Sequence, residues 1–563
     1  MNTRPERPRI TTELGMLQTP PDGPAQFTRE GGPDGPGGHV LLLGIGPDPA
    51  QAAALLPPGR AVYAMEAPGF KAQMPPSWHA ALPGHWRLLE PGDLDEFLIA
   101  GAELWVYRPG ARLFPSFWGP ILGRCRFLAG LRAAPALPAP RPSVLLPGAE
   151  GDLLVRELAA ALTRAGLAVR VLPPKHTGEL VPALLRQERP ALFLCVNFRG
   201  LDPFGELFHL LDAARVPVCV WCVDNPFHLV SGLRSPFWTR VRLALTDASF
   251  APALRLHGVR EVLHLPLAAC PELFAPGGGG GAGAGAGGGA GGSTGGSTDA
   301  GCPGGGAGAG AGTALGSRGA MAPDRGVPSG VGPEPDLGLD GRMVFVGRSQ
   351  FPGREKFFAG SAVPRWQWDA ARAMLGAGGR PDYHWWAERL AIWPLWPGAE
   401  ARRIGAGADA ASRELRAACL EAAAPLGLTV YGDQGWAERL PAGATLRPPV
   451  DYYTTLPAIY RQAAWTLNAT SLLLPHGLTQ RHFDVWAAGG LLLTDATPGL
   501  SLFPEELVRE VRFATPADLP TLARRLAPGT PLRHDIQTAW RTEILTHHTY
   551  THRVAALREW LGV

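Results

Sequence analysis

The sequence predicts an α/β protein built from several parallel-sheet units. Short apolar runs alternate with segments of helical periodicity along most of the 563 residues, which is the pattern of strands joined by helical crossovers. Polar or glycine residues follow many of these runs, as expected at strand ends that face a cleft. A Gly/Ala-repeat stretch separates two such halves and predicts two domains joined by a tether.

Composition excludes several functional classes. The formal charge of +3 is small for this length, so no nucleic-acid partner is expected. No apolar run reaches about 18 residues, which predicts no transmembrane segment, and the N-terminus lacks the apolar core of a signal peptide. The seven cysteines form no disulfide or metal-binding pattern. We therefore predict a cytoplasmic protein.

The first part of the chain is predicted to hold a tail and a small module. Residues 1–38 are rich in Pro, Gly and charge and are expected to be disordered. Residues 39–140 begin with a strand, a glycine turn and a second strand that ends at Glu66, the outline of a nucleotide-binding unit. Pro49 replaces the third glycine of the motif, which favours a structural, non-binding Rossmann-like module. A methyltransferase-like activity is the weaker alternative.

A second α/β unit is predicted for residues 141–276. Apolar strands over 191–197 and 216–223 both end in polar residues, and the carboxyl ends of parallel strands meet at one edge of a sheet. Asp224 and His228 follow the second of these strands and are candidates for a general base or an acceptor contact. The alternative is that Asp224 caps the turn before Pro226.

Residues 277–341 consist of Gly/Ala repeats with Ser and Thr, followed by Pro-rich sequence, and are predicted to be a disordered linker. A third α/β unit is predicted for 342–545, with a terminal helix over 546–563. Its strands are expected near 343–347, 428–432, 465–469 and 491–495.

The segment 475–495 organises this last unit. It reads as a loop containing His476 and Gly477, a helix with Thr479 as a plausible N-cap, a glycine stop and a buried strand. A helix N-terminus preceded by glycine offers unpaired N–H groups that suit phosphate oxygens. Asp484 lies about one and a half turns into that helix, where a carboxylate could accept hydrogen bonds from ribose hydroxyls.

This segment resembles the C-terminal domain of the CgeB-like glycosyltransferases, the spore maturation protein group, which are relatives of the two-domain GT-B enzymes. Further similarities are a strand–Gly–Arg turn at Arg348, a Tyr-Gly-x-x-Trp turn at 431–436 and a His-Thr-Tyr ending at 548–550. The resemblance implies two Rossmann-like parallel-sheet domains that face a cleft. The extra N-terminal α/β module and the Gly-rich linker would be additions to that GT-B-like fold.

The resemblance also implies roles for individual residues. Arg348 and Lys356 would neutralise the departing diphosphate, and Asp484 matches the glutamate that binds the ribose in many retaining relatives. His476 falls where those enzymes carry the first of the two glutamates, eight residues before the ribose-binding one, and is a catalytic candidate. Donor-binding positions implied by the matching motifs are Arg348, Lys356, Tyr431, Gly432, Asn468, Gly477, Thr479, Arg481 and Asp484.

The resemblance thus implies a metal-independent glycosyltransferase, without a cofactor, that uses a nucleotide-diphosphate sugar. Its acceptor would bind the 141–276 unit. Retaining and inverting mechanisms both stay open, because His476 departs from the retaining pattern while Asp224 or His228 could act as an inverting base. A non-catalytic protein that binds nucleotide sugars or glycans within a larger assembly is the alternative.

Overall fold

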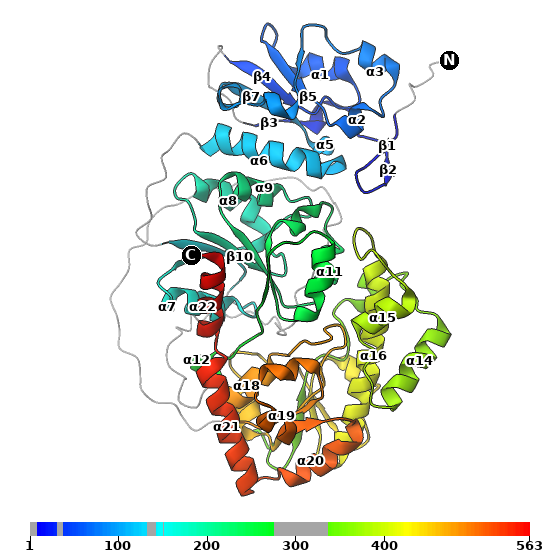
Figure 1. Ribbon diagram of the computed structural model, residues 1–563, viewed down its shortest axis with the longest axis vertical. Coiled ribbons are helices and arrows are strands. Elements are labelled where there is room, and N and C mark those ends of the chain that lie inside the picture. The colour runs from blue at the N-terminus through cyan, green and yellow to red at the C-terminus, as the bar shows by residue number, and fades with distance from the viewer. Residues whose placement is uncertain (1–7, 31–37, 132–141, 150, 275–335) are drawn as a thin grey trace.

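The protein is described by a computed structural model that covers residues 8–30, 38–131, 142–149, 151–274 and 336–563. Three α/β units follow one another along the long axis of the molecule, each with its own sheet (Figure 1). Residues 275–335, which include most of the predicted linker 277–341, lie outside the described residues. Residues 336–341 do not fit the linker prediction, because Leu339 is fully buried in a small cluster with Val344 and Ile459.

The N-terminal module contains a five-stranded sheet in the order β3-β7-β4-β5-β6. Its strands are β3 (Phe27–Glu30), β4 (His39–Leu43), β5 (Val62–Met65), β6 (Arg87–Leu88) and β7 (Ala102–Tyr107). Its helices are α1 (Pro49–Leu55), α2 (Pro68–Lys71), α3 (Pro76–Ala80), α4 (Glu96–Ala100), α5 (Arg108–Leu113) and α6 (Pro115–Leu131).

The prediction of a disordered tail over 1–38 is wrong for residues 8–30. The segment forms a two-stranded sheet, β1 (Ile10–Thr11) with β2 (Leu17–Gln18), and β3 then pairs antiparallel with β7 at the edge of the module. Ile10 is fully buried in the module's core. Average composition could not predict these few apolar contacts, because they depend on strands that come later in the chain.

The carboxylate of Glu66 fills the glycine turn of the module. It accepts hydrogen bonds from the backbone N–H groups of Ile45 at 2.8 Å and Gly46 at 3.2 Å. Burial raises the pKa of Glu66 to about 7. The amides that would approach a nucleotide phosphate in a binding unit are thus occupied by the module's own acid.

The middle domain is a six-stranded parallel sheet in the order β13-β12-β11-β10-β8-β9. Its strands are β8 (Ser143–Pro147), β9 (Ala168–Leu172), β10 (Leu192–Val196), β11 (Val218–Cys222), β12 (Arg242–Leu245) and β13 (Val262–His264). Its helices are α7 (Val155–Arg164), α8 (Thr177–Leu185), α9 (Glu206–Ala213), α10 (Pro226–Val230), α11 (Ala251–Leu256) and α12 (Pro271–Phe274). Cys219 and Cys222 face opposite sides of β11, in two different core clusters.

The C-terminal domain repeats this design with the sheet order β16-β15-β14-β17-β18-β19, again all parallel. Its strands are β14 (Met343–Val346), β15 (Thr429–Tyr431), β16 (Thr445–Arg447), β17 (Trp465–Asn468), β18 (Leu492–Asp495) and β19 (Arg512–Phe513). Helices α17 (Leu456–Gln462), α18 (Arg481–Ala487), α19 (Glu505–Val511), α20 (Leu519–Arg525) and α21 (Pro531–His547) complete it.

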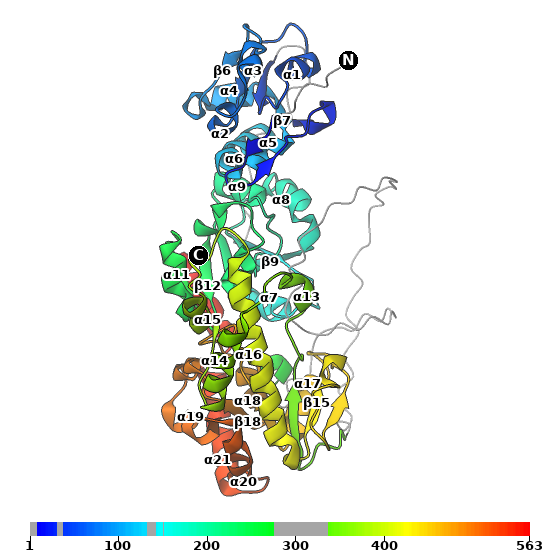
Figure 2. The ribbon, with the colours of Figure 1, turned by 90° about the vertical axis from the view of Figure 1, so that its right-hand side faces the viewer.

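A helical insertion between β14 and β15 reaches across to the middle domain (Figure 2). It comprises α13 (Arg354–Phe357), α14 (Arg365–Gly376), α15 (Tyr383–Leu390) and α16 (Glu400–Ala423). Tyr383, Trp386 and Ile404 of this insertion share a core with Phe227 and Phe250 of the middle domain. The insertion therefore ties the two sheets together on one side.

The terminal helix α22 (Tyr550–Leu561) ties them on the other side. It packs against α7 of the middle domain, and Arg553 donates to the carbonyl oxygens of Pro266 and Leu267. No helix within the described ranges is long and apolar enough to cross a membrane. Two Rossmann-like sheets that face each other confirm the GT-B-like fold that the sequence predicts.

Candidate functional site

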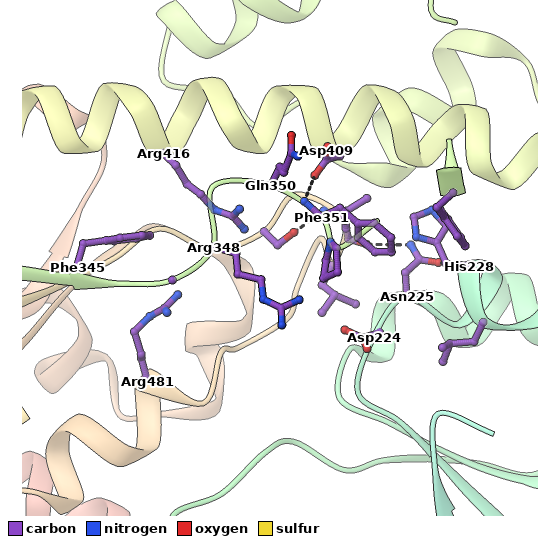
Figure 3. Close-up of a pocket in the computed structure, with 17 residues that line it drawn as sticks. Asp224, Asn225, His228, Phe345, Arg348, Gln350, Phe351, Asp409, Arg416 and Arg481 are labelled. Atoms are coloured by element: carbon purple, nitrogen blue, oxygen red, sulfur yellow. Dashed lines mark hydrogen bonds between the residues drawn. The ribbon is translucent and has the colours of Figure 1, made fainter. Parts of the chain in front are cut away.

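A cavity of about 230 Å³ lies between the middle and C-terminal domains. Its walls come from the loop after β11, the loop after β14, helix α16, the segment 471–474 and the first residue of α18 (Figure 3). Both loops leave the carboxyl end of a parallel strand, where open α/β sheets bind their ligands. The volume is slightly below the ~300–1,000 Å³ of typical small-molecule sites, and it suits one section of a larger ligand.

Arg348 stands on the loop after β14 and lines the cavity. Within the described chain its guanidinium makes no hydrogen bond or ion pair. The loop itself is held by the Tyr-Gly-x-x-Trp turn, since Trp436 Nε1 donates to the Gly347 carbonyl at 2.9 Å. A side chain at Gly432 would place its Cβ 2.5 Å from that same carbonyl oxygen. The turn expected to lie near the donor base thus supports the loop that carries Arg348.

Arg481 lines the same cavity from the start of α18. Its Nε donates to Asn468 Oδ1 at 2.8 Å, and its guanidinium also donates to the Val346 carbonyl. Thr479 donates through its hydroxyl to the same Asn468 oxygen at 3.0 Å. Burial lowers the pKa of Arg481 from its ordinary value, but an arginine remains charged near neutral pH. Asn468 therefore orients Arg481, and Thr479 in turn holds Asn468. Neither Asn468 nor Thr479 lines the cavity.

Arg416 supplies a third cation, which the sequence analysis missed. It lies on α16, two turns beyond Asp409, and both side chains line the cavity. Asp409 is paired with Arg354 at 2.7 Å, whereas Arg416 has no hydrogen-bond partner among the residues that the structure describes. No local sequence signal marks Arg416, because only the docking of α16 brings it to the cavity.

The middle domain contributes Asp224, Asn225 and His228 to the opposite wall. Asp224 accepts a hydrogen bond from Asn197 Nδ2 at 2.7 Å. The cap before Pro226 is formed by Asn225, whose side chain accepts from the N–H groups of Phe227 and His228. The alternative hypothesis that Asp224 is the capping residue is therefore wrong. Figure 3 shows the carboxylate of Asp224 on the side that faces Arg348.

His228 is unsuited to the role of general base. Burial lowers its pKa to about 3, so its imidazole has little affinity for a proton. The ring lies among Phe351, Phe357 and Tyr383. A side chain at Gly405 of α16 would collide with His228 Nε2, which shows how closely that nitrogen approaches the helix backbone. His228 shapes the wall as a neutral side chain.

Several predicted donor-binding residues lie outside the cavity. Lys356 is exposed on α13, and Tyr431 is buried with its hydroxyl accepting from Arg447 at 2.8 Å. His476 is exposed, and its backbone N–H donates to Asp247 at 2.9 Å. Gly477 packs against the side chain of Leu474. None of these residues borders the space between Asp224 and the three arginines.

The predicted helix-tip site is not formed as expected. Helix α18 begins at Arg481, and the capping position falls on Gln480, which makes no side-chain cap, so Thr479 is not the N-cap. Asp484 is fully buried and accepts hydrogen bonds from Tyr452 at 2.6 Å and Gln480 at 3.0 Å. Burial raises the pKa of this carboxyl well above its usual range. Asp484 does not line the cavity, so the predicted ribose contact stays a prediction that this cavity does not support.

The charges around the cavity favour an anion. Arg348, Arg416 and Arg481 come from three different elements, and Figure 3 shows their guanidinium groups around one space. Asp409 is already paired, which leaves Asp224 as the acid opposite this cluster. Clustered guanidinium groups match phosphate oxygens in geometry and charge. Among the described residues, no group of three or more His, Cys, Asp or Glu side chains could hold a metal ion.

Comparison with known proteins identifies a class for the C-terminal domain. Residues 413–559 match a family model described as "Glycosyl transferase-like". This stretch contains Arg416, Asn468 and Arg481 of the site, while Arg348 and Asp224 lie outside it. Because the match covers about a quarter of the chain, it characterises this domain and not the whole protein. No curated protein sequence matches the chain.

Solved structures with a similar arrangement include Anabaena Alr3699/HepE in complex with UDP-glucose, at 9% identity and a TM-score of 0.39. A DNA-modifying β-glucosyltransferase matches at 9% identity with a TM-score of 0.34, and the β-glucosyltransferase of T4 phage matches at 8% identity with a TM-score of 0.35. Each comparison covers 75% of this chain and 99% of the other. At these identities and scores the similarity does not bear on function.

Proposed function

We propose that the protein is a glycosyltransferase that takes its sugar from a nucleoside-diphosphate sugar. The observation that carries this proposal is the convergence of Arg348, Arg416 and Arg481 on an interdomain cavity, opposite Asp224. Three cations can hold a diphosphate and stabilise the charge that develops on it as the sugar leaves. The family match over residues 413–559 supports the same class. We further propose that the protein is related to the CgeB-like glycosyltransferases.

In this mechanism the donor diphosphate binds the three guanidinium groups, and the acceptor hydroxyl lies against the middle domain. Asp224 accepts the hydroxyl proton as the acceptor oxygen attacks the anomeric carbon, and the sugar–phosphate bond breaks with its electrons going to the diphosphate. An attack from the side opposite the diphosphate inverts the anomeric centre. The arginines supply the countercharge, so the proposed reaction requires no metal ion.

The six described cysteines are free and buried, which fits a cytoplasmic location.

A screen of donors tests this function. UDP-, GDP- and dTDP-sugars are each added to the full chain, and the melting temperature is measured, since a ligand of the native state stabilises it. The sugar that raises it is then incubated with candidate acceptors, with and without EDTA. Selective stabilisation followed by EDTA-resistant transfer supports the proposal. Selective binding without release or transfer of sugar would instead favour the non-catalytic binding protein, and no stabilisation by any donor would contradict both.

A further inference from the structure

Asn197 connects the end of one strand to the acid at the end of the next. It follows β10, and its Nδ2 donates to Asp224 Oδ2 at 2.7 Å. Its Oδ1 accepts from the backbone N–H of Val223 at 2.9 Å and from that of Asp224 at 3.4 Å. The residue is 8% exposed. One amide therefore holds both the backbone and the carboxylate of the loop that carries Asp224.

The backbone at this point is strained. Asn197 and the next residue, Phe198, have φ angles of +54° and +60°, in the left-handed region that costs free energy for side chains other than glycine. Asparagine tolerates this conformation better than most residues, whereas phenylalanine does not. Such strain persists where the surroundings fix it and gathers at functional sites. Here Phe198 is buried and its ring lies 6.3 Å from that of Phe237.

We propose that Asn197 is a positioning residue for the transfer reaction. Its amide N–H holds one oxygen of Asp224, which turns the carboxylate toward the cavity, where it can receive the acceptor proton. This inference rests on the proposed function, since it assigns Asp224 the role of base. The left-handed backbone and the hydrogen bonds to Asp224 thus occur at the same residue.

The isosteric variant Asn197→Asp is the sharpest test. It keeps the oxygen that accepts from Val223 but replaces the N–H donor by a second carboxylate oxygen beside Asp224. Two carboxylates at that distance share a proton. We expect the acid limb of the rate–pH profile to move to higher pH by about one unit or more, and the rate at neutral pH to fall about tenfold or more. The donor dissociation constant, which depends on the arginines, should stay within about twofold of the wild-type value.

The variant Asn197→Gly separates the side chain from the backbone. Glycine accepts the positive φ without strain, so folding is preserved while the amide is lost. We expect kcat to fall about 10–100-fold through misorientation of Asp224, with donor binding and melting temperature retained. An Asn197→Asp profile that overlays the wild type, or an Asn197→Gly protein with unchanged kcat, would overturn the positioning role alone. Failure of the wild-type protein to bind or transfer any donor would overturn the proposed function as well.

Discussion

Nε of Arg481 donates to the side-chain oxygen of Asn468 at 2.8 Å, and this bond joins the end of β17 to the start of α18. Asn468 is fully buried. Its neutral amide orients the guanidinium without cancelling its charge, so that charge remains available to a ligand in the cavity.

Replacing this neutral partner by an acid should weaken anion binding. In Asn468→Asp the new carboxylate pairs with Arg481. The hydroxyl of Thr494, which lies 3.1 Å from Asn468 Nδ2 in the wild type, can donate to the second oxygen of that carboxylate. We expect the donor dissociation constant to rise about tenfold, as one cation of three is neutralised. Titration calorimetry measures this change, and circular dichroism checks the fold. Unchanged affinity in a folded variant would show that Arg481 does not contact the donor.

Arg348 and Lys356 offer a matched pair of cations on neighbouring segments. The Arg348→Ala variant removes an unpaired guanidinium from the cavity, so we expect donor affinity to fall about 10–100-fold. The Lys356→Ala variant removes an exposed charge outside the cavity and should change affinity less than about twofold. Both dissociation constants are measured by calorimetry at one salt concentration. Equal losses in the two variants would indicate a diffuse charge effect rather than a site.

Asp224→Asn should separate catalysis from binding. The amide keeps the size of the side chain but cannot take the acceptor proton, so we expect kcat to fall about 10²–10⁴-fold. Donor affinity should change little, because the arginines are intact. The control is Asp212→Asn, which alters an exposed acid of the same domain that pairs with Arg240. Steady-state transfer kinetics decide the point, and a fully active Asp224→Asn enzyme would remove the base from the mechanism.

Glu157 makes stability depend on pH. It is 1% exposed, accepts a hydrogen bond from Tyr453 of the C-terminal domain at 3.2 Å, and burial raises its pKa to about 7. The folded protein holds this proton more tightly than the unfolded chain, whose glutamates titrate near 4.5. The resulting stabilisation is full below about pH 4.5 and is lost as the pH rises through about 7.

The variant Glu157→Gln cannot ionise and should escape this loss. We expect its melting temperature, relative to wild type, to be roughly 2–4 °C higher at pH 8 than at pH 5. Scanning calorimetry at the two pH values measures the difference. Glu179→Gln, at a carboxylate whose side chain is 81% exposed, is the control and should show no such trend. A pH-independent difference for Glu157→Gln would mean that this carboxyl titrates normally.

The strands and their cleft-facing ends could be predicted because they rest on local pattern. Apolar runs such as those that became β11, β14 and β17 are long enough to be recognised alone, and parallel topology places their ends together. Asp224 was found in this way, whereas the roles of Arg348 and Arg481 came from motifs that resemble those of known glycosyltransferases.

The remaining features depend on contacts between distant segments. Asp484 was assigned to ribose from its position in a motif. In the structure its carboxylate instead accepts hydrogen bonds from Tyr452, which lies in the segment before α17, and from Gln480. Arg416 lies in an ordinary helical segment, and only the packing of α16 along the cavity gives it a role. Within residues 8–30, β3 pairs with β7, which lies far along the chain, and Ile10 is buried in the core of the module.

The central claim is that Arg348, Arg416 and Arg481 bind a diphosphate. The most direct measurement is calorimetry with matched pairs (UDP and uridine, GDP and guanosine, dTDP and thymidine) on the wild type and on an Arg348→Ala/Arg416→Ala double variant. We predict that at least one diphosphate binds the wild type about 100-fold or more tightly than its nucleoside, and that the double variant loses most of this preference. Equal binding of diphosphate and nucleoside, or a preference that survives in the double variant, would contradict the claim.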